Sequence, residues 1–141
     1  MVSPAPNGAL EVLERMREAA IARSAEDMSS VYAADAVHEF PFTRPGVPSR
    51  MEGRDAIISL ITAFWSTSPL RYERYRTIAI YDTADPDTIV VEQEVQGTSS
   101  TTGSFVLPNI VVLKARHGEI AHLRDYANIL AVEEATGGPI S

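Results

Sequence analysis

Asp125 is the residue of this chain whose type and position best suit acid-base chemistry. It lies in "HLRDYANIL" (122–130), which alternates like a β-strand and places Leu123, Ala127 and Ile129 on the same face as Asp125. An apolar environment destabilises the carboxylate form, so burial here would raise the pKa of Asp125 toward neutrality. A carboxyl group that titrates near neutral pH can accept and return a proton, which makes Asp125 the predicted catalytic residue.

Asp125 also has a structural interpretation. Buried carboxylates are normally partnered: an arginine such as Arg74 or Arg76 from another strand would hold Asp125 in an ion pair, or backbone amides would donate hydrogen bonds to it. The two interpretations differ in what they require. An acid-base site needs Asp125 on a cavity wall with a pKa near neutrality, whereas a packed module needs an ion pair and an ordinary low pKa.

His38 is the second candidate for proton transfer. In "AVHEFPF" it shares a strand face with Phe40 and Phe42, and neutral imidazole exchanges protons near physiological pH. It would assist Asp125 or orient a substrate oxygen. The alternative is a hydrogen-bonded histidine of the core.

Glu94 is the third catalytic candidate, although its position is ambiguous. In "VVEQEVQG", Glu92 and Glu94 share one strand face, and alternation with Val91 and Val95 sends both glutamates to solvent. If they face the cavity instead, Glu94 would tune the pKa of Asp125, because neighbouring like charges resist joint ionisation.

Metal and cofactor chemistry are not expected. The three histidines, His38, His117 and His122, are scattered without ligand spacing, and the chain has no cysteine. The stretch "GVPSRMEG" lacks the glycine spacing of a phosphate loop.

The composition indicates one globular domain. The chain has 141 residues, of which 45% are hydrophobic and 22% charged. Its net charge of −7 argues against nucleic acid and against an anionic membrane as partners. No window approaches the roughly 18 apolar residues of a membrane span, so we expect a cytoplasmic protein. We assign 9–132 to the domain, and 1–8 and 133–141 to flexible tails.

The periodicity predicts an α+β fold with the helices first. We expect helices over 9–23, 25–34 and 53–67, a short strand over 36–42, and four long strands over 71–82, 88–97, 104–116 and 119–130. Short connections favour an antiparallel meander, and a curved sheet of this kind would form a cone whose concave face the helices cover. The predicted pocket in the cone is lined by Tyr32, Phe40, Phe64, Trp65, Glu92, Asn109 and Leu123.

Four segments resemble the nuclear transport factor two-like superfamily, in its SnoaL-like branch. They are "VYAADAVHEFPF", "GRDAI", "VVEQEVQGT" and "HGEIAHLRDYANIL". The resemblance implies a cone-shaped α+β barrel, a hydrophobic pocket and a homodimer. The chain is similar to phenazine-biosynthesis A/B-type proteins, SnoaL-type polyketide cyclases and limonene-epoxide hydrolases.

The residue matches to these relatives are uneven. "LRDY" is similar to the last-strand motif of limonene-epoxide hydrolases, which implies a water-activating role for Asp125. Their arginine and second aspartate fall on Glu92 and Glu94, and their water-holding tyrosine and asparagine fall on His38 and Phe40. Phenazine-biosynthesis A/B-type proteins have an acidic residue at the place of Asp125 and another near Glu94.

The sequence therefore leads to one main functional hypothesis and two alternatives. The main one is a cofactor-independent acid-base enzyme of secondary metabolism or antibiotic biosynthesis, of the isomerase, cyclase or condensation type, acting on a hydrophobic small molecule. The alternatives are a non-catalytic ligand-binding or dimeric assembly module of the same fold, and an epoxide hydrolase.

Overall fold

The computed structural model describes residues 8–138, which form four helices and six strands. The helices are α1 (Ala9–Ala22), α2 (Ala25–Val31), α3 (Arg54–Thr67) and α4 (Ile129–Thr136). The strands are β1 (Tyr32–Glu39), β2 (Arg50–Glu52), β3 (Leu70–Asp82), β4 (Thr88–Ser99), β5 (Gly103–Arg116) and β6 (Glu119–Tyr126). Most of the predicted N-terminal tail and the last three residues of the C-terminal tail lie outside the described residues.

The six strands form one mixed sheet in the order β2-β1-β6-β5-β4-β3. The predicted antiparallel meander of β3 to β6 is confirmed. One strand pair departs from an all-antiparallel sheet, because β1 pairs with β6 in parallel. The chain reaches β3 through β2 and α3, and the meander then returns across the sheet, so β6 arrives beside β1 in the same direction. The sheet stays open at its β2 and β3 edges.

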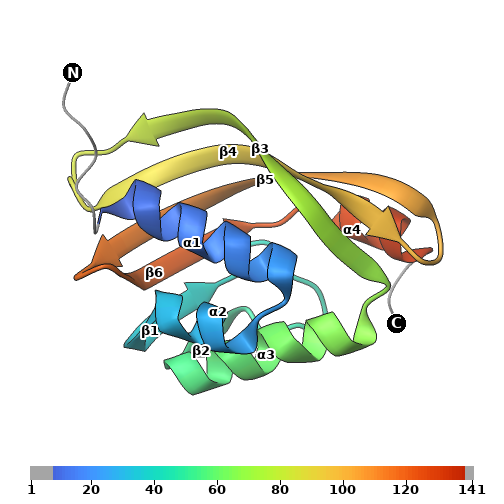
Figure 1. Ribbon diagram of the computed structural model, residues 1–141, viewed down its shortest axis with the longest axis horizontal. Helices are drawn as coiled ribbons and strands as arrows, with labels where there is room; N and C mark the ends of the chain where they lie inside the picture. Colours follow the sequence, from blue (N-terminus) through green and yellow to red (C-terminus); the bar gives the residue numbers. More distant parts are fainter. Residues whose placement is uncertain (1–7, 139–141) are drawn as a thin grey trace.

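The helices cover the concave face of the curved sheet, as the sequence predicted. Figure 1 shows α1 lying across the meander, with α2 in front of β1 and α3 along the bottom of the view. Residues on the inner stripe of α1, including Val12 and Leu13, are fully buried. The predicted cap of the second helix is also present, since Ser24 Oγ accepts a hydrogen bond of 3.1 Å from the Asp27 amide.

Two hydrophobic clusters lie along the concave face. The larger one joins α1, α2 and α3 to the sheet through residues such as Leu13, Val91 and Val111. The smaller one lies toward α4 and consists of Leu70, Val95, Phe105, Leu107 and Ala135. Along β4 and β5 the clusters are separated by one polar position per strand, Gln93 and Asn109. The concave face is therefore divided by a polar row.

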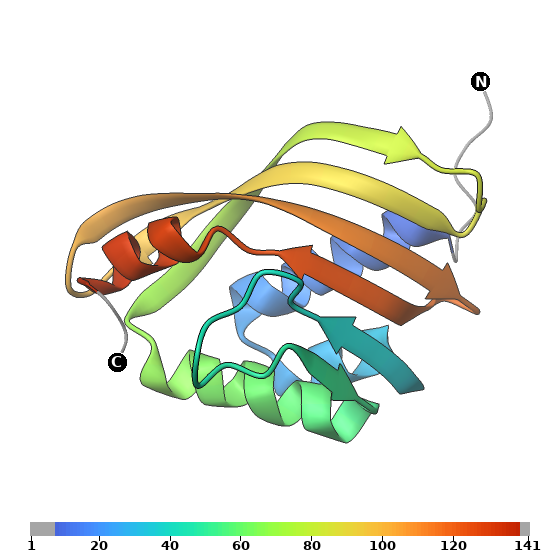
Figure 2. The ribbon, with the colours of Figure 1, turned by 180° about the vertical axis from the view of Figure 1, so that it is seen from behind.

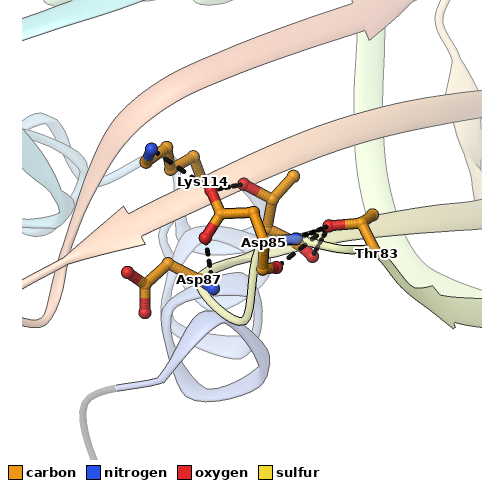
Figure 3. A network of polar contacts seen from close by, with 5 residues as sticks. Thr83, Asp85, Asp87 and Lys114 are labelled. Carbon is orange, nitrogen blue, oxygen red and sulfur yellow. Dashed lines mark hydrogen bonds and ion pairs between the residues drawn. The ribbon is translucent and has the colours of Figure 1, made fainter.

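The turn between β3 and β4, predicted at "TADPD", is held by a polar network (Figure 3). The carboxylate of Asp85 accepts hydrogen bonds from the Asp87 amide at 3.0 Å and from Thr88 Oγ1 at 2.9 Å. It also pairs with Lys114 Nζ of β5 at 3.2 Å. These contacts hold the pKa of Asp85 below its usual value, with the backbone hydrogen bond as the main cause.

The C-terminal segment differs from the prediction. The strand expected over 119–130 ends at Tyr126, and Ile129 begins helix α4, whose N-cap Asn128 accepts a hydrogen bond from the Ala131 amide. The predicted domain boundary at residue 132 therefore falls inside a helix. Thr102 Oγ1 donates to the Ala135 carbonyl at 2.6 Å, which ties α4 to the β4–β5 turn (Figure 2).

Other boundaries shifted by a few residues. The helix expected over 25–34 ends at Val31, because Tyr32 already has the extended backbone of β1. The short strand β2 was not predicted. No helix within residues 8–138 is long and apolar enough to cross a membrane.

Candidate active site

Asp125 lies on the concave face of the sheet. It is opposite Val111 on β5, and Leu123 is opposite Leu113, so these four residues point to the same side. The Asp125 side chain keeps some contact with solvent, although protein surrounds most of it. Burial raises its pKa to about 6, against the opposing effect of a hydrogen bond of 2.9 Å that Asn109 Nδ2 donates to Oδ1.

Within residues 8–138, no arginine forms an ion pair with Asp125. Arg74 donates to Gln96, and Arg76 pairs with Glu94 at 3.3 Å. Among the described residues Asp125 forms no ion pair. The interpretation of Asp125 as half of a packed ion pair is therefore wrong for this structure, because the β3 arginines lie on the opposite face of the sheet.

The charge of Asp125 acts on three tyrosines, of which Tyr32 is fully buried and Tyr72 and Tyr75 are partly buried. Burial raises the pKa of Tyr32, Tyr72 and Tyr75, and the negative charge of Asp125 raises each of them further. All three phenols therefore keep their protons and can donate hydrogen bonds at any physiological pH.

His38 is a buried neutral imidazole. It is 5% exposed, and its Nδ1 lies 3.0 Å from the Tyr32 hydroxyl oxygen. Burial lowers the pKa of His38 to about 4, and the charge of His122 lowers it further. His38 is opposite Leu123 on the adjacent strand β6, so it shares the concave face with Asp125. The structure thus places two of the three predicted catalytic residues on the same face of the sheet.

Glu94 and Glu92 do not lie beside Asp125. Glu92 is opposite Ile110 and Glu94 is opposite Pro108, on the convex face. The neighbours that alternate with them, Val91 and Gln93, are buried on the concave face. The strand alternation therefore predicted the correct face for both glutamates. Glu94 cannot share a proton with Asp125, because the sheet lies between them.

The predicted lining residues differ in their access to the site. Tyr32 and Leu123 are 1% and 2% exposed, so they lie behind the surface that a ligand would contact. Phe40, Phe64, Trp65 and Asn109 are partly exposed. Phe64 packs on the smaller cluster and Phe40 on His38, with ring centroids 4.9 Å apart.

A buried arginine and glutamine complete the polar row and were missed from the sequence. Arg17 of α1 is 7% exposed and donates from Nη2 to Gln93 Oε1 at 2.7 Å and from Nε at 3.2 Å. Gln93 is in turn opposite Asn109, the partner of Asp125. Two features of the sequence could have indicated these residues. Arg17 follows Leu13 by four residues on the apolar stripe of its helix, and Gln93 lies between Val91 and Val95 on one strand face.

A large surface concavity lies mainly on the convex side of the sheet. This groove of about 950 Å³ is lined by residues of β3 to β6, by Phe42 and by the start of α4, and it contains Glu92 and Glu94. Several of its apolar side chains are strongly exposed, among them Phe42, Ile110 and Leu130. The described residues hold no cluster of three or more His, Cys, Asp or Glu side chains that could bind a metal ion.

A known protein family matches most of this chain. The sequence profile of the SnoaL-like domain matches residues 13–123. The chain belongs to the SnoaL-like family. This confirms the resemblance to the SnoaL-like branch of the nuclear transport factor two-like superfamily.

Two relatives align over most of this SnoaL-like chain. The uncharacterized protein YesE of Bacillus subtilis is 30% identical over 131 residues, which are 92% of this chain and 88% of YesE. The PhzA/B-like protein PA3332 of Pseudomonas aeruginosa is 32% identical over 109 residues, which are 77% of this chain and 75% of PA3332.

Solved structures show the same fold. A proposed isomerase from Bacillus subtilis is 29% identical with a TM-score of 0.84, covering 94% of both chains. An LEH-like epoxide hydrolase of Mycobacterium tuberculosis is 16% identical with a TM-score of 0.65, over 91% of this chain and 88% of its own. RV0760c of Mycobacterium tuberculosis, bound to estradiol-17beta-hemisuccinate, is 16% identical with a TM-score of 0.70, over 87% of this chain and 95% of its own. The last two show the fold alone.

Proposed function

We propose that this SnoaL-like protein is a cofactor-independent acid-base enzyme that moves a proton on a hydrophobic small molecule. The observation that carries the proposal is Asp125, a carboxyl group on the concave face with a pKa raised to about 6 and no ion pair among the described residues. Such a group is mostly ionised at pH 7 and can still retain a proton during turnover, which suits an isomerase or cyclase. We also propose that the protein acts in secondary metabolism and is located in the cytoplasm.

The surrounding residues have complementary roles in this proposal. Asn109 donates a hydrogen bond that favours the carboxylate, so that Asp125 is ready to accept a proton. The neutral hydroxyls of Tyr72 and Tyr75 can stabilise negative charge that develops on a substrate oxygen. Phe64 and Trp65 supply apolar surface for the body of the substrate.

Hydrogen–deuterium exchange tests this function without knowledge of the natural substrate. Apolar compounds with an acidic C–H bond are incubated with the protein in deuterated buffer, and loss of the proton signal is followed by NMR. We expect exchange above the buffer rate, abolished in Asp125→Asn and unchanged in Asp55→Asn, an exposed aspartate of α3. Equal exchange by the wild type and Asp125→Asn would refute the proposal.

A ligand-binding module without catalysis is the second candidate. It is favoured by the structural neighbour solved with a steroid ester, although that likeness extends only to the fold. A binding module would retain ligand equally well in the wild type and in Asp125→Asn, with no exchange in either. An epoxide hydrolase remains a variant of the enzyme proposal in which Asp125 activates water.

We also propose a homodimer formed through the convex face. The apolar side chains exposed there, such as Val106 and Ile110 at 50% and 42%, form the kind of patch that a partner normally covers. Light scattering should show a dimer for the wild type and a monomer for Ile110→Arg. A monomeric wild type at micromolar concentration would contradict this part of the proposal.

A further inference from the structure

Helix α4 is attached directly to the strand that carries Asp125. Figure 2 shows α4 joined to β6 by a short linker and lying beside the β4–β5 turn. The linker consists of Ala127 and Asn128, which belong to neither element. Asn128 Oδ1 accepts a hydrogen bond of 3.1 Å from the Ala131 amide, so the first turn of α4 is capped from within the segment. The helix can therefore move on its linker without losing this cap.

The packing of α4 on the sheet is sparse. The helix has eight residues, and only Ala135 among them is buried. Ala131 and Val132 are partly buried against the smaller cluster, whereas Leu130 is 72% exposed. A helix shorter than about 12 residues is marginal in water by itself, so the position of α4 depends on these few contacts.

Two hydroxyl groups hold the far end of α4. Thr102 Oγ1 donates to the Ala135 carbonyl at 2.6 Å, and Thr101 Oγ1 donates to the Thr136 carbonyl at 3.1 Å. Both threonines are exposed residues of the β4–β5 turn. Water can replace both bonds when the helix leaves, so the net loss on opening is small.

The surface beneath α4 is closed to ligands while the helix is in place. The smaller cluster is buried, and Tyr72 and Tyr75 pack on it. The negative charge of Asp125 raises the pKa of both tyrosines, so this cluster adjoins the candidate acid. The recess that Phe64 and Trp65 line beside Tyr72 has no room for a water molecule. A ligand can therefore contact the cluster only when one of its covering elements moves.

Among the covering elements, α4 is the one that can leave most easily. Strands β3, β4 and β5 are hydrogen-bonded into the sheet. Helix α3 also touches the cluster through Phe64, but its Ile57, Ile58 and Trp65 pack in the larger cluster. Helix α1 buries six of its residues. Elements that open locally are those with few buried apolar contacts, which describes α4.

We infer that α4 is a lid, which swings away from the β4–β5 turn to admit an apolar small molecule to the smaller cluster. The side chains that it uncovers, Leu70, Val95, Phe105 and Leu107, bind the apolar body of that molecule. The polar row of Gln93 and Asn109 borders them, so a polar group at one end of the molecule faces Asp125. This inference rests on the proposed function for the role of Asp125, and it adds the route of entry.

An engineered disulfide tests whether α4 has to move. A Cβ on residue 137 would lie 3.8 Å from the Thr101 Cβ, and the mean Cβ–Cβ distance in disulfides is about 3.8 Å. The natural chain has no cysteine, so Thr101→Cys/Gly137→Cys can form only this bond within one chain. Gly137 has a φ of +105°, which strains a cysteine. Because the oxidised and reduced forms share that strain, their comparison isolates the lock.

Entry of 4-bromobiphenyl is followed by stopped-flow fluorescence of Trp65, the single tryptophan, which bromine quenches on contact. Binding on the convex face leaves this signal unchanged, because the sheet lies between. We expect association at least about tenfold slower in the oxidised variant than in the same variant with reductant, since binding then waits for a blocked opening step. The wild type should show one rate with and without reductant, and mass spectrometry shows that the disulfide has formed. Equal rates in the two forms, or no quenching in the wild type, overturn the inference.

Hydrogen exchange of backbone amides gives a second measurement that needs no ligand. Thr101→Val/Thr102→Val removes both hydroxyl donors, so amide exchange in α4 should rise about tenfold. Thr98→Val is the matched control, because its hydroxyl bonds to Glu73 and not to α4. Unchanged exchange of α4 in the double valine variant contradicts a lid held by these two threonines.

The lid and the proposed function fail in distinguishable ways. If exchange of C–H protons depends on Asp125 and is equally fast in the oxidised and reduced cysteine variant, the proposed function stands and the lid is wrong. If the disulfide slows ligand entry but the wild type catalyses no C–H exchange, the lid stands and the proposed function fails.

Discussion

Replacing Asp125 with asparagine should stabilise the protein at pH 8 and not at pH 4. The pKa of Asp125 is about 6 in the folded protein, against an ordinary value of about 3.9 in an unfolded chain. Above pH 6 the carboxylate is charged in both states, and only the folded state has the cost of a buried charge. About two pKa units at 1.36 kcal/mol each correspond to a cost of about 3 kcal/mol.

The sign of the pH dependence follows from proton binding. Between pH 4 and pH 6 the folded protein retains a proton that the unfolded chain has lost, so raising the pH lowers the free energy of unfolding. Below pH 4 both states are protonated and the cost disappears. Asp125→Asn has no such titration, and its amide oxygen can still accept the hydrogen bond from Asn109 Nδ2.

Urea unfolding measures this difference. Unfolding free energies of the wild type and Asp125→Asn are compared from pH 4 to pH 8, and contributions from other titrating groups cancel in the difference. Asp85→Asn is the control of opposite sign, because the pKa of Asp85 is lowered and its contribution is present at neutral pH and lost in acid. A difference between wild type and Asp125→Asn that does not grow from pH 4 to pH 7 would refute the reasoning.

Three further predictions concern the polar row and the sheet. Asn109→Leu removes the hydrogen bond that favours the Asp125 carboxylate, so the pKa of Asp125 should rise by about one unit, measured by ¹³C NMR titration of labelled aspartate. Gln93→Leu leaves the buried Arg17 guanidinium without its main acceptor, so the unfolding free energy should fall by about 2–4 kcal/mol in urea, whereas Gln96→Leu on the convex face should have little effect. Gly97→Ala places a Cβ 1.9 Å from the Arg71 carbonyl oxygen, so calorimetry should show a destabilisation of about 2 kcal/mol or more; an unchanged melting temperature would contradict the β3–β4 contact.

The elements that follow strict periodicity were predictable from the sequence. For the meander strands and the helix containing Trp65, most of the predicted ends lie within two residues of the observed ends. Their apolar positions repeat at the spacing of the element. Asp125 was found for the same reason, since a carboxylate interrupts an apolar strand face. Alternation also gave the correct face for Glu92 and Glu94.

Tertiary contacts decide what the sequence did not reveal. Tyr72 and Tyr75 reach the concave face of β3 three residues apart, because the strand is irregular between Tyr72 and Arg74. No two-residue alternation predicts that both point inward. Helix α4 and the parallel pairing of β1 with β6 likewise depend on contacts with distant segments. The hydrogen bond between Tyr32 and His38 links positions six residues apart. A regular strand would hold two such positions too far apart to bond, so the sequence spacing does not predict this contact.

The polar row between the two hydrophobic clusters has a consequence for how this protein can diverge. The larger cluster connects three helices to the sheet and carries most of the buried apolar surface, so substitutions there affect folding. The smaller cluster, with α4 attached to it, lies on the other side of Gln93 and Asn109. Substitutions at Phe105 or Leu107 therefore affect the packing beneath α4 and leave the larger cluster in place. The two parts of the concave face can thereby change in sequence separately, each at its own cost in stability.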